Sequence, residues 1–242
     1  MSSGIIILQG RDLDLAAVIR VAREGARVAL HPEARARVTA ARQVVERLAG
    51  EGHAIYGVTT GLGAGKDVRL SPEEMEDFQR LALQGRCVAV GPRFPTDVVR
   101  AMLLVRANGM ATGGSGVTPM ILDTLIRMLN AGLHPVVPSQ GSIGTADLPP
   151  LAHLALPLIG LGEAEYRGER VPAGEALRRA GIQPVALGPK DAIALLSSNA
   201  ASVGHGALVL WDALEVMEAA TVVSALSLEG FRGNVSPLDP RV

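Results

Sequence analysis

Residues 132–153 read Gly132-Leu133-His134-Pro135-Val136-Val137-Pro138-Ser139-Gln140-Gly141-Ser142-Ile143-Gly144-Thr145-Ala146-Asp147-Leu148-Pro149-Pro150-Leu151-Ala152-His153. The stretch places prolines, glycines and small hydroxyl residues between two apolar segments. Because proline fixes φ and glycine tolerates positive φ, this composition predicts tight, partly strained turns before a helix begins. Strained backbone is concentrated at functional sites, so we expect a site here.

The composition favours a mainly α-helical fold with an aliphatic core. Of the 242 residues, 48% are hydrophobic and only 2% are aromatic, which leans towards packed helices rich in Ala and Leu. The formal net charge of −1 gives no electrostatic case for nucleic-acid binding. The single cysteine, Cys87, excludes an intrachain disulfide and leaves too few thiols for a structural zinc site, and we predict no metal.

Hydrophobic periodicity predicts the order of the elements. We expect a strand over 5–9 and helices over 12–23, 31–48, 71–85, from 96 onward, 118–131 and 173–179. Residues 190–230 are apolar and free of proline, and acidic side chains interrupt them, so we expect one or two long buried helices and no membrane span. The start of the chain lacks the features of a signal peptide, which predicts a cytoplasmic protein.

The stretch 141–153 resembles the core motif of the aromatic amino acid lyases, the family of histidine, phenylalanine and tyrosine ammonia-lyases and related aminomutases. Family members read Gly-Ser-Val-Gly-Ala-Ser-Gly-Asp-Leu-Ala-Pro-Leu-Ala-His, and their Ala-Ser-Gly cyclises into the electrophile methylidene-imidazolone (MIO). The flanks match here, at 141–144 and 147–148. Between Gly144 and Asp147 the family has three residues, whereas this chain has two, Thr145 and Ala146.

Two further segments carry the resemblance. Residues 56–63 are similar to the family's Tyr-Gly-Val-Asn-Thr-Gly-Phe-Gly loop, and Tyr56 matches its tyrosine; the glycine spacing fits neither the P-loop nor the dinucleotide pattern. Residues 106–116 match Arg-x-Asn…Gly-x-Ser-Gly. Family enzymes are about twice as long as this chain. The resemblance therefore implies the first half of their fold, with a head domain over 1–189 and the first long helices of a bundle over 190–242.

The resemblance also implies a self-derived prosthetic group and no external cofactor. In the family, the glycine nitrogen attacks the carbonyl two residues back and the serine loses water to become the methylidene. Here Gly144 would supply the carbonyl, Ala146 the nitrogen and Thr145 the reacting carbon, beside Asp147. A dehydrated threonine carries an extra methyl at that carbon, which argues against a working MIO group.

Other positions match family residues with known roles. Tyr56 would handle protons, and Ser197 replaces the asparagine that stabilises the oxygen of the prosthetic group. Arg86 occupies the position that selects the substrate, where it would favour an acidic side chain or, equally, pair with a structural carboxylate. Gly63 and Asn108 would complete the substrate site. By contrast, Asp147 on its own chemistry is a candidate cap for the following helix.

Three functions follow as hypotheses. The first is a subunit of an ammonia-lyase or aminomutase assembly acting on a small amino acid. A partner chain in a hetero- or homo-oligomer would supply the second half, because unpartnered bundle helices expose a large apolar face. The second is a non-catalytic subunit that keeps the fold and completes a partner's active site. The third is a repurposed pocket that binds a small anion at Arg86.

Overall fold

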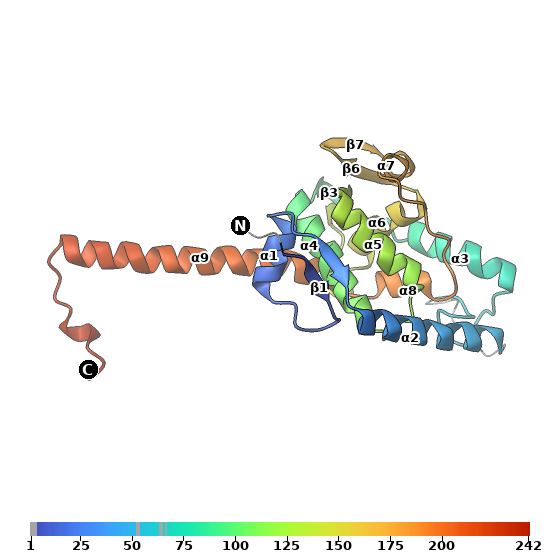
Figure 1. Cartoon of the computed structure of the whole chain (residues 1–242), viewed down its shortest axis with the longest axis horizontal. Coiled ribbons are helices and arrows are strands. Elements are labelled where there is room, and N and C mark those ends of the chain that lie inside the picture. The colour runs from blue at the N-terminus through green and yellow to red at the C-terminus, as the bar shows by residue number, and fades with distance from the viewer. Residues whose placement is uncertain (1–3, 52–53, 63–64, 66) are drawn as a thin grey trace.

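The computed structural model describes residues 4–51, 54–62, 65 and 67–242. It has a mainly helical head from which one long helix projects (Figure 1). The helices are α1 (Leu15–Ala22), α2 (Pro32–Gly50), α3 (Pro72–Gln84), α4 (Thr96–Ala111), α5 (Pro119–Ala131), α6 (Leu148–Ala155), α7 (Ala173–Arg179), α8 (Asp191–Leu196) and α9 (Ala200–Gly230), with 3-10 helices η2 (Leu156–Ile159) and η3 (Ser236–Leu238). The strands are β1 (Ile6–Leu8), β2 (Val28–Leu30), β3 (Val90–Arg93), β4 (Leu133–Pro135), β5 (Pro138–Gln140), β6 (Glu163–Tyr166) and β7 (Glu169–Pro172). The mainly α-helical fold predicted from composition is confirmed.

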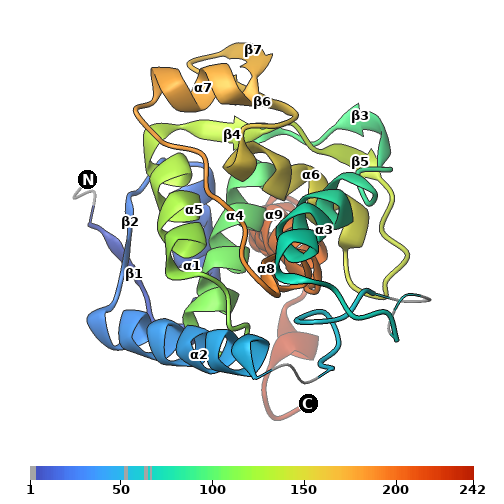
Figure 2. The ribbon, with the colours of Figure 1, turned by 90° about the vertical axis from the view of Figure 1, so that its right-hand side faces the viewer.

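Helix α4 forms the centre of the head, in contact with α1, α5 and the start of α9 (Figure 2). Its side chains at Met102, Leu103 and Met110 are fully buried, so the aliphatic core expected from composition lies around this helix. The crossing with α9 is close: a Cβ added to Gly204 would lie 2.8 Å from the backbone nitrogen of Met102. Glycine is therefore required where the two helices meet.

Local sequence signals located several helix starts correctly. Ser71 and Glu74 form a capping box at the start of α3, in which each side chain accepts a hydrogen bond from the other residue's backbone amide. Helix α7 occupies residues 173–179 as predicted. Helix α1 begins at Leu15, later than expected, because the side chain of Asp14 accepts a hydrogen bond from Ala17 N and ends the preceding loop.

The short strands were mostly missed. Strands β1 and β2 pair in parallel, β3 pairs with β5, and β4, β6 and β7 form an antiparallel sheet. Each has only three or four residues, and several contain Pro or Gly. Runs of this length are too short for alternation to show in the sequence, so only β1 was predicted.

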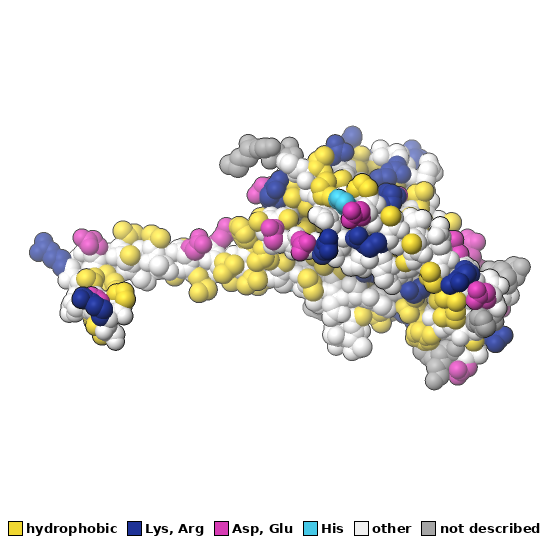
Figure 3. All heavy atoms as spheres, turned by 60° about the horizontal axis from the view of Figure 1, so that its bottom comes forward, with side chains coloured by type: hydrophobic (Ala, Val, Ile, Leu, Met, Phe, Trp, Pro, Cys, Tyr) yellow, Lys and Arg dark blue, Asp and Glu magenta, His cyan; other side chains and the backbone are white. Residues whose placement is uncertain are grey.

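Helix α9 differs from the expectation of long buried helices. Its buried residues, Ala200, Ala201, Gly204 and Leu208, all lie at its start. Apolar side chains farther along are exposed, including Val216 at 67% and Leu226 at 66%, and they line the projecting helix in Figure 3. By length and hydropathy alone, Asp191–Gly230 would suffice to cross a membrane. A break after α8 divides it, however, and α8 packs against α3 and α6.

Candidate functional site

The loop between β5 and α6 has the strained backbone that its sequence predicted. Gly144 has φ +83° and Ala146 has φ +58°. Alanine rarely adopts left-handed φ, because its Cβ crowds the backbone. Ile143, at the tip, is 86% exposed, and Thr145 is also exposed. The loop thus presents Thr145 to solvent on a strained turn.

Asp147 joins this loop to two other segments. Its carboxylate is fully buried, and its Oδ1 accepts hydrogen bonds of 2.7 Å from the hydroxyls of Ser142 and Ser202. Its Oδ2 accepts one of 2.7 Å from Ser202 N. Its own amide donates to Ser198 O at 2.8 Å. Asp147 stands at the N-cap position of α6 as predicted, but its side chain makes no capping hydrogen bond there.

Tyr56 and Ser197 meet at one cavity of about 450 Å³. The described residues that line it are Tyr56, Arg106, Gly109, Ser115, Lys190, Ile193, Ala194 and Ser197. The Tyr56 side chain is 55% exposed, so the cavity is open at the tyrosine. The hydrogen bond from Asp147 N to Ser198 O ties the loop that carries Thr145 to the residue that follows Ser197. The cavity thus brings the Tyr56 loop and the segment 106–116 together with Ser197.

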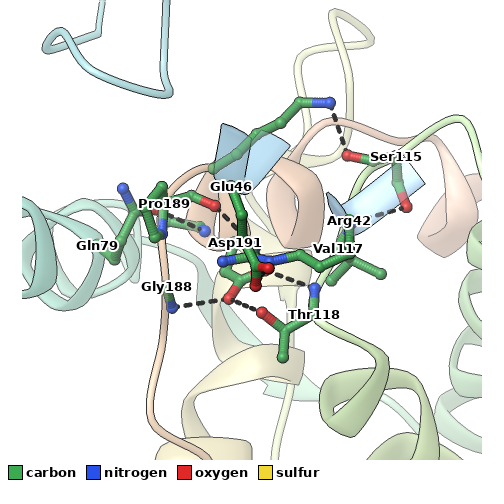
Figure 4. A network of polar contacts seen from close by, with 11 residues as sticks. Arg42, Glu46, Gln79, Ser115, Val117, Thr118, Gly188, Pro189 and Asp191 are labelled. Carbon is green, nitrogen blue, oxygen red and sulfur yellow. Dashed lines mark hydrogen bonds and ion pairs between the residues drawn. The ribbon is translucent and has the colours of Figure 1, made fainter. Parts of the chain in front are cut away.

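A polar network beneath this cavity centres on Asp191 (Figure 4). The buried carboxylate accepts hydrogen bonds from Thr118 N at 2.8 Å, Thr118 Oγ1 at 2.6 Å and Gly188 N at 2.8 Å. It also pairs with Arg42 at 3.2 Å. Burial raises the pKa of Asp191, while the bonds from Thr118 oppose this rise. The network ties the chain before α8 to the start of α5.

Lys190 comes directly before Asp191 and enters the cavity. Its Nζ donates a hydrogen bond of 2.7 Å to Ser115 O, and burial lowers its pKa. Sequence reasoning missed Lys190, Ser115 and Arg106 as cavity residues. Arg106 and Ser115 lie within the segment 106–116 that resembles a family motif, but nothing local in the sequence shows that these side chains share a cavity with Lys190.

Arg86 and Asn108 lie away from this cavity. Arg86 Nη1 donates to Ala82 O at 2.9 Å, at the end of α3, and no ion pair links Arg86 to a carboxylate in the described part of the chain. Pairing of Arg86 with a structural carboxylate, and its contact with a substrate, both stay predictions. Asn108 Oδ1 accepts from Gly10 N at 3.0 Å, on a different face of α4 from Arg106. Gly63 lies outside the described residues.

The residues of the loop do not fit the MIO group. Formation needs a serine that can become a methylidene and a following nitrogen without a neighbouring Cβ. Here the nitrogen belongs to Ala146 and the reacting carbon to Thr145. We therefore derive no chemical step through such a group. Over the ranges that the structure describes, no cluster of three or more His, Cys, Asp or Glu side chains is placed to hold a metal.

A sequence model of the aromatic amino acid lyases matches residues 13–242, so the chain belongs to this family. Histidine ammonia-lyase of Symbiobacterium thermophilum is 46% identical over 234 residues, which cover 96% of this chain and 46% of that protein. The chain therefore spans about half the length of the curated relatives it matches.

Two solved structures superpose on nearly the whole chain. An ergothionase from Treponema denticola superposes with a TM-score of 0.94 and 34% identity, over 99% of this chain and 48% of its own. A tyrosine aminomutase from Streptomyces globisporus superposes with a TM-score of 0.92 and 36% identity, over 97% of this chain and 44% of its own. Because these matches include nearly the whole chain, the projecting helix α9 is a shared element of the lyase fold.

Proposed function

We propose that this chain works as a subunit of a cytoplasmic lyase-family assembly that acts on a small amino acid, with the second half of the fold supplied by a partner chain. The observation that carries the proposal is the exposed apolar surface of α9. Val216, Met217, Val223 and Leu226 are each at least 60% exposed on this helix. A surface of this kind is covered when helices associate into a bundle.

The cavity supports an amino acid as the ligand. Tyr56 contributes a phenol and Ser197 a hydroxyl to the same cavity, next to two cationic side chains. A phenol and a hydroxyl can exchange protons with, or donate hydrogen bonds to, an amine or a carboxylate. In this proposal, Tyr56 handles the proton and Ser197 orients the ligand, both from this chain.

A second function, a non-catalytic subunit that completes a partner's active site, is favoured by one specific observation. The loop has a strained backbone and an aspartate anchor, but it has Thr145-Ala146 where the family motif has Ala-Ser-Gly. In this version the fold and the assembly are retained, and the electrophile is supplied by another chain.

Two measurements test the proposal. The chain is co-expressed with the second half of the Symbiobacterium thermophilum enzyme, and size-exclusion chromatography with light scattering measures their association. A stable complex is expected, and a chain that stays monomeric and soluble beside the second half contradicts the assembly. Addition of histidine, tyrosine and glutamate to the complex, followed by ammonia detection, then separates the catalytic from the non-catalytic version.

A further inference from the structure

Among the described residues of the head, three arginines are buried, and the guanidinium groups of two of them have several hydrogen-bond partners. Arg42, 6% exposed, binds Glu46, Pro189 O and Asp191. Arg100, 9% exposed, donates to Val21 O, Ala22 O and Leu129 O and contacts His134. These two follow the general rule that buried charges are paired or fully hydrogen-bonded.

Arg106 departs from this rule. It is 6% exposed, its Nε is buried without a hydrogen-bond partner, and no bond or ion pair joins its guanidinium to any described residue. Burial lowers its pKa to about 10, so the group still carries its charge at neutral pH. A buried, charged and unpaired guanidinium is destabilising unless a ligand compensates it.

The cavity of about 450 Å³ is where such a ligand would bind. Arg106 lines it from α4, and its Nη1 lies 3.8 Å from where a Cβ of Gly109 would stand. Lys190 lines it from the start of α8 and uses one of its three donors on Ser115 O. None of the described residues that line the cavity is acidic. The cationic side chains of Arg106 and Lys190 thus line a cavity to which no described acidic side chain contributes.

We propose that Arg106 and Lys190 form a carboxylate-binding site in this cavity. A guanidinium presents a planar pair of N–H donors that matches the two oxygens of a carboxylate, and an ammonium adds a third donor. The carboxylate belongs either to an Asp or Glu side chain of the second half of the fold, or to a free amino acid. The first source rests on the proposed function, because it needs the complementing half.

The first experiment tests the site on the chain alone. Isothermal titration with sodium acetate, against sodium chloride at equal ionic strength, should show saturable binding. Arg106→Gln should weaken it about tenfold or more, since a hydrogen bond to a charged group contributes about one order of magnitude. Arg80→Gln, which removes an exposed guanidinium on α3, should leave it unchanged. Absence of acetate binding, or equal binding by Arg106→Gln, overturns the proposal; circular dichroism verifies that each variant is folded.

The second experiment identifies the source in the complex with the second half of the Symbiobacterium thermophilum enzyme. If a side chain of that half occupies the site, the complex no longer binds acetate and Arg106→Gln weakens its assembly about tenfold. If a free amino acid is the ligand, the complex still binds acetate and assembles equally with Arg106→Gln. When no complex forms with the unmodified chain, the assembly proposal fails, whereas the acetate titration still decides the site.

Discussion

Asp147 and Ser202 are joined by two hydrogen bonds of 2.7 Å across 55 residues of sequence. One comes from the amide of Ser202 and the other from its hydroxyl, and both reach a carboxylate that is fully buried. The strained loop and the first turn of α9 are thereby held as one unit.

Removing this carboxylate should therefore destabilise the chain. Asp147→Ala is expected to lower the free energy of unfolding by about 3 kcal/mol, because hydrogen bonds to a buried charge are lost. Urea denaturation followed by circular dichroism measures the change. Asp77→Ala, at a side chain that is 70% exposed, should change it by no more than about 0.5 kcal/mol. Equal effects of the two substitutions would contradict the anchoring role of Asp147.

The central residues of the loop can be tested by restoring the family motif. Replacement of Thr145-Ala146 by Ala-Ser-Gly should allow cyclisation, since a glycine nitrogen attacks without a neighbouring Cβ. Intact mass spectrometry should then show the loss of two water molecules, with a new near-ultraviolet absorbance. Replacement by Ala-Ala-Gly keeps the length but lacks the serine, and it should retain its full mass. The unmodified chain should also retain its full mass, and a loss of two waters from it would show that Thr145 does react.

Acid should destabilise the head through His134. Burial and the neighbouring Arg100 lower the pKa of His134 to about 4, whereas the unfolded chain has a pKa of about 6.5. As pH falls below 6.5, the unfolded state binds a proton that the folded state does not, so stability falls until about pH 4. The loss between pH 7 and pH 5 should be about 2 kcal/mol.

Urea midpoints at the two pH values measure this dependence. His134→Gln keeps an acceptor for Arg100 but cannot titrate. Between pH 7 and pH 5, the free energy of unfolding of this variant should therefore fall by about 2 kcal/mol less than that of the unmodified chain. His31→Gln, at the start of α2, should retain the full dependence. If His134→Gln and the unmodified chain lose stability equally, another group is responsible.

The exposed face of α9 gives a prediction that separates folding from assembly. Leu226 is 66% exposed, so Leu226→Lys should alter the stability of the isolated chain by no more than about 0.5 kcal/mol. It should weaken association with the second half about tenfold or more, because a charge would then enter an apolar interface. Glu218→Lys introduces a lysine on the same helix at a position that is already charged, and association should be affected less although the net charge changes by two units. Equal weakening by both would argue against an apolar bundle contact at Leu226.

Local signals in the sequence determined much of the fold. The capping box at Ser71, the helix over 173–179 and the strained turn before α6 all follow from the conformational preferences of a few neighbouring residues. The family motifs brought Tyr56 and Ser197 forward as site residues, and both line one cavity. The short strands beyond β1 gave no comparable signal, because their pairing depends on contacts between distant segments.

The tertiary structure alone decided which polar side chains are anchors and which are unpaired. From sequence, Asp147 was a candidate helix cap, but its distant partner Ser202 is brought to it by the packing of α9 against the head. Arg42 and Arg106 are chemically identical, yet only Arg42 meets a carboxylate when the chain before α8 folds against α2. Burial and pairing are properties of the packed chain. The sequence determined the family and the strained loop, while the fold left Arg106 charged, buried and lining a cavity.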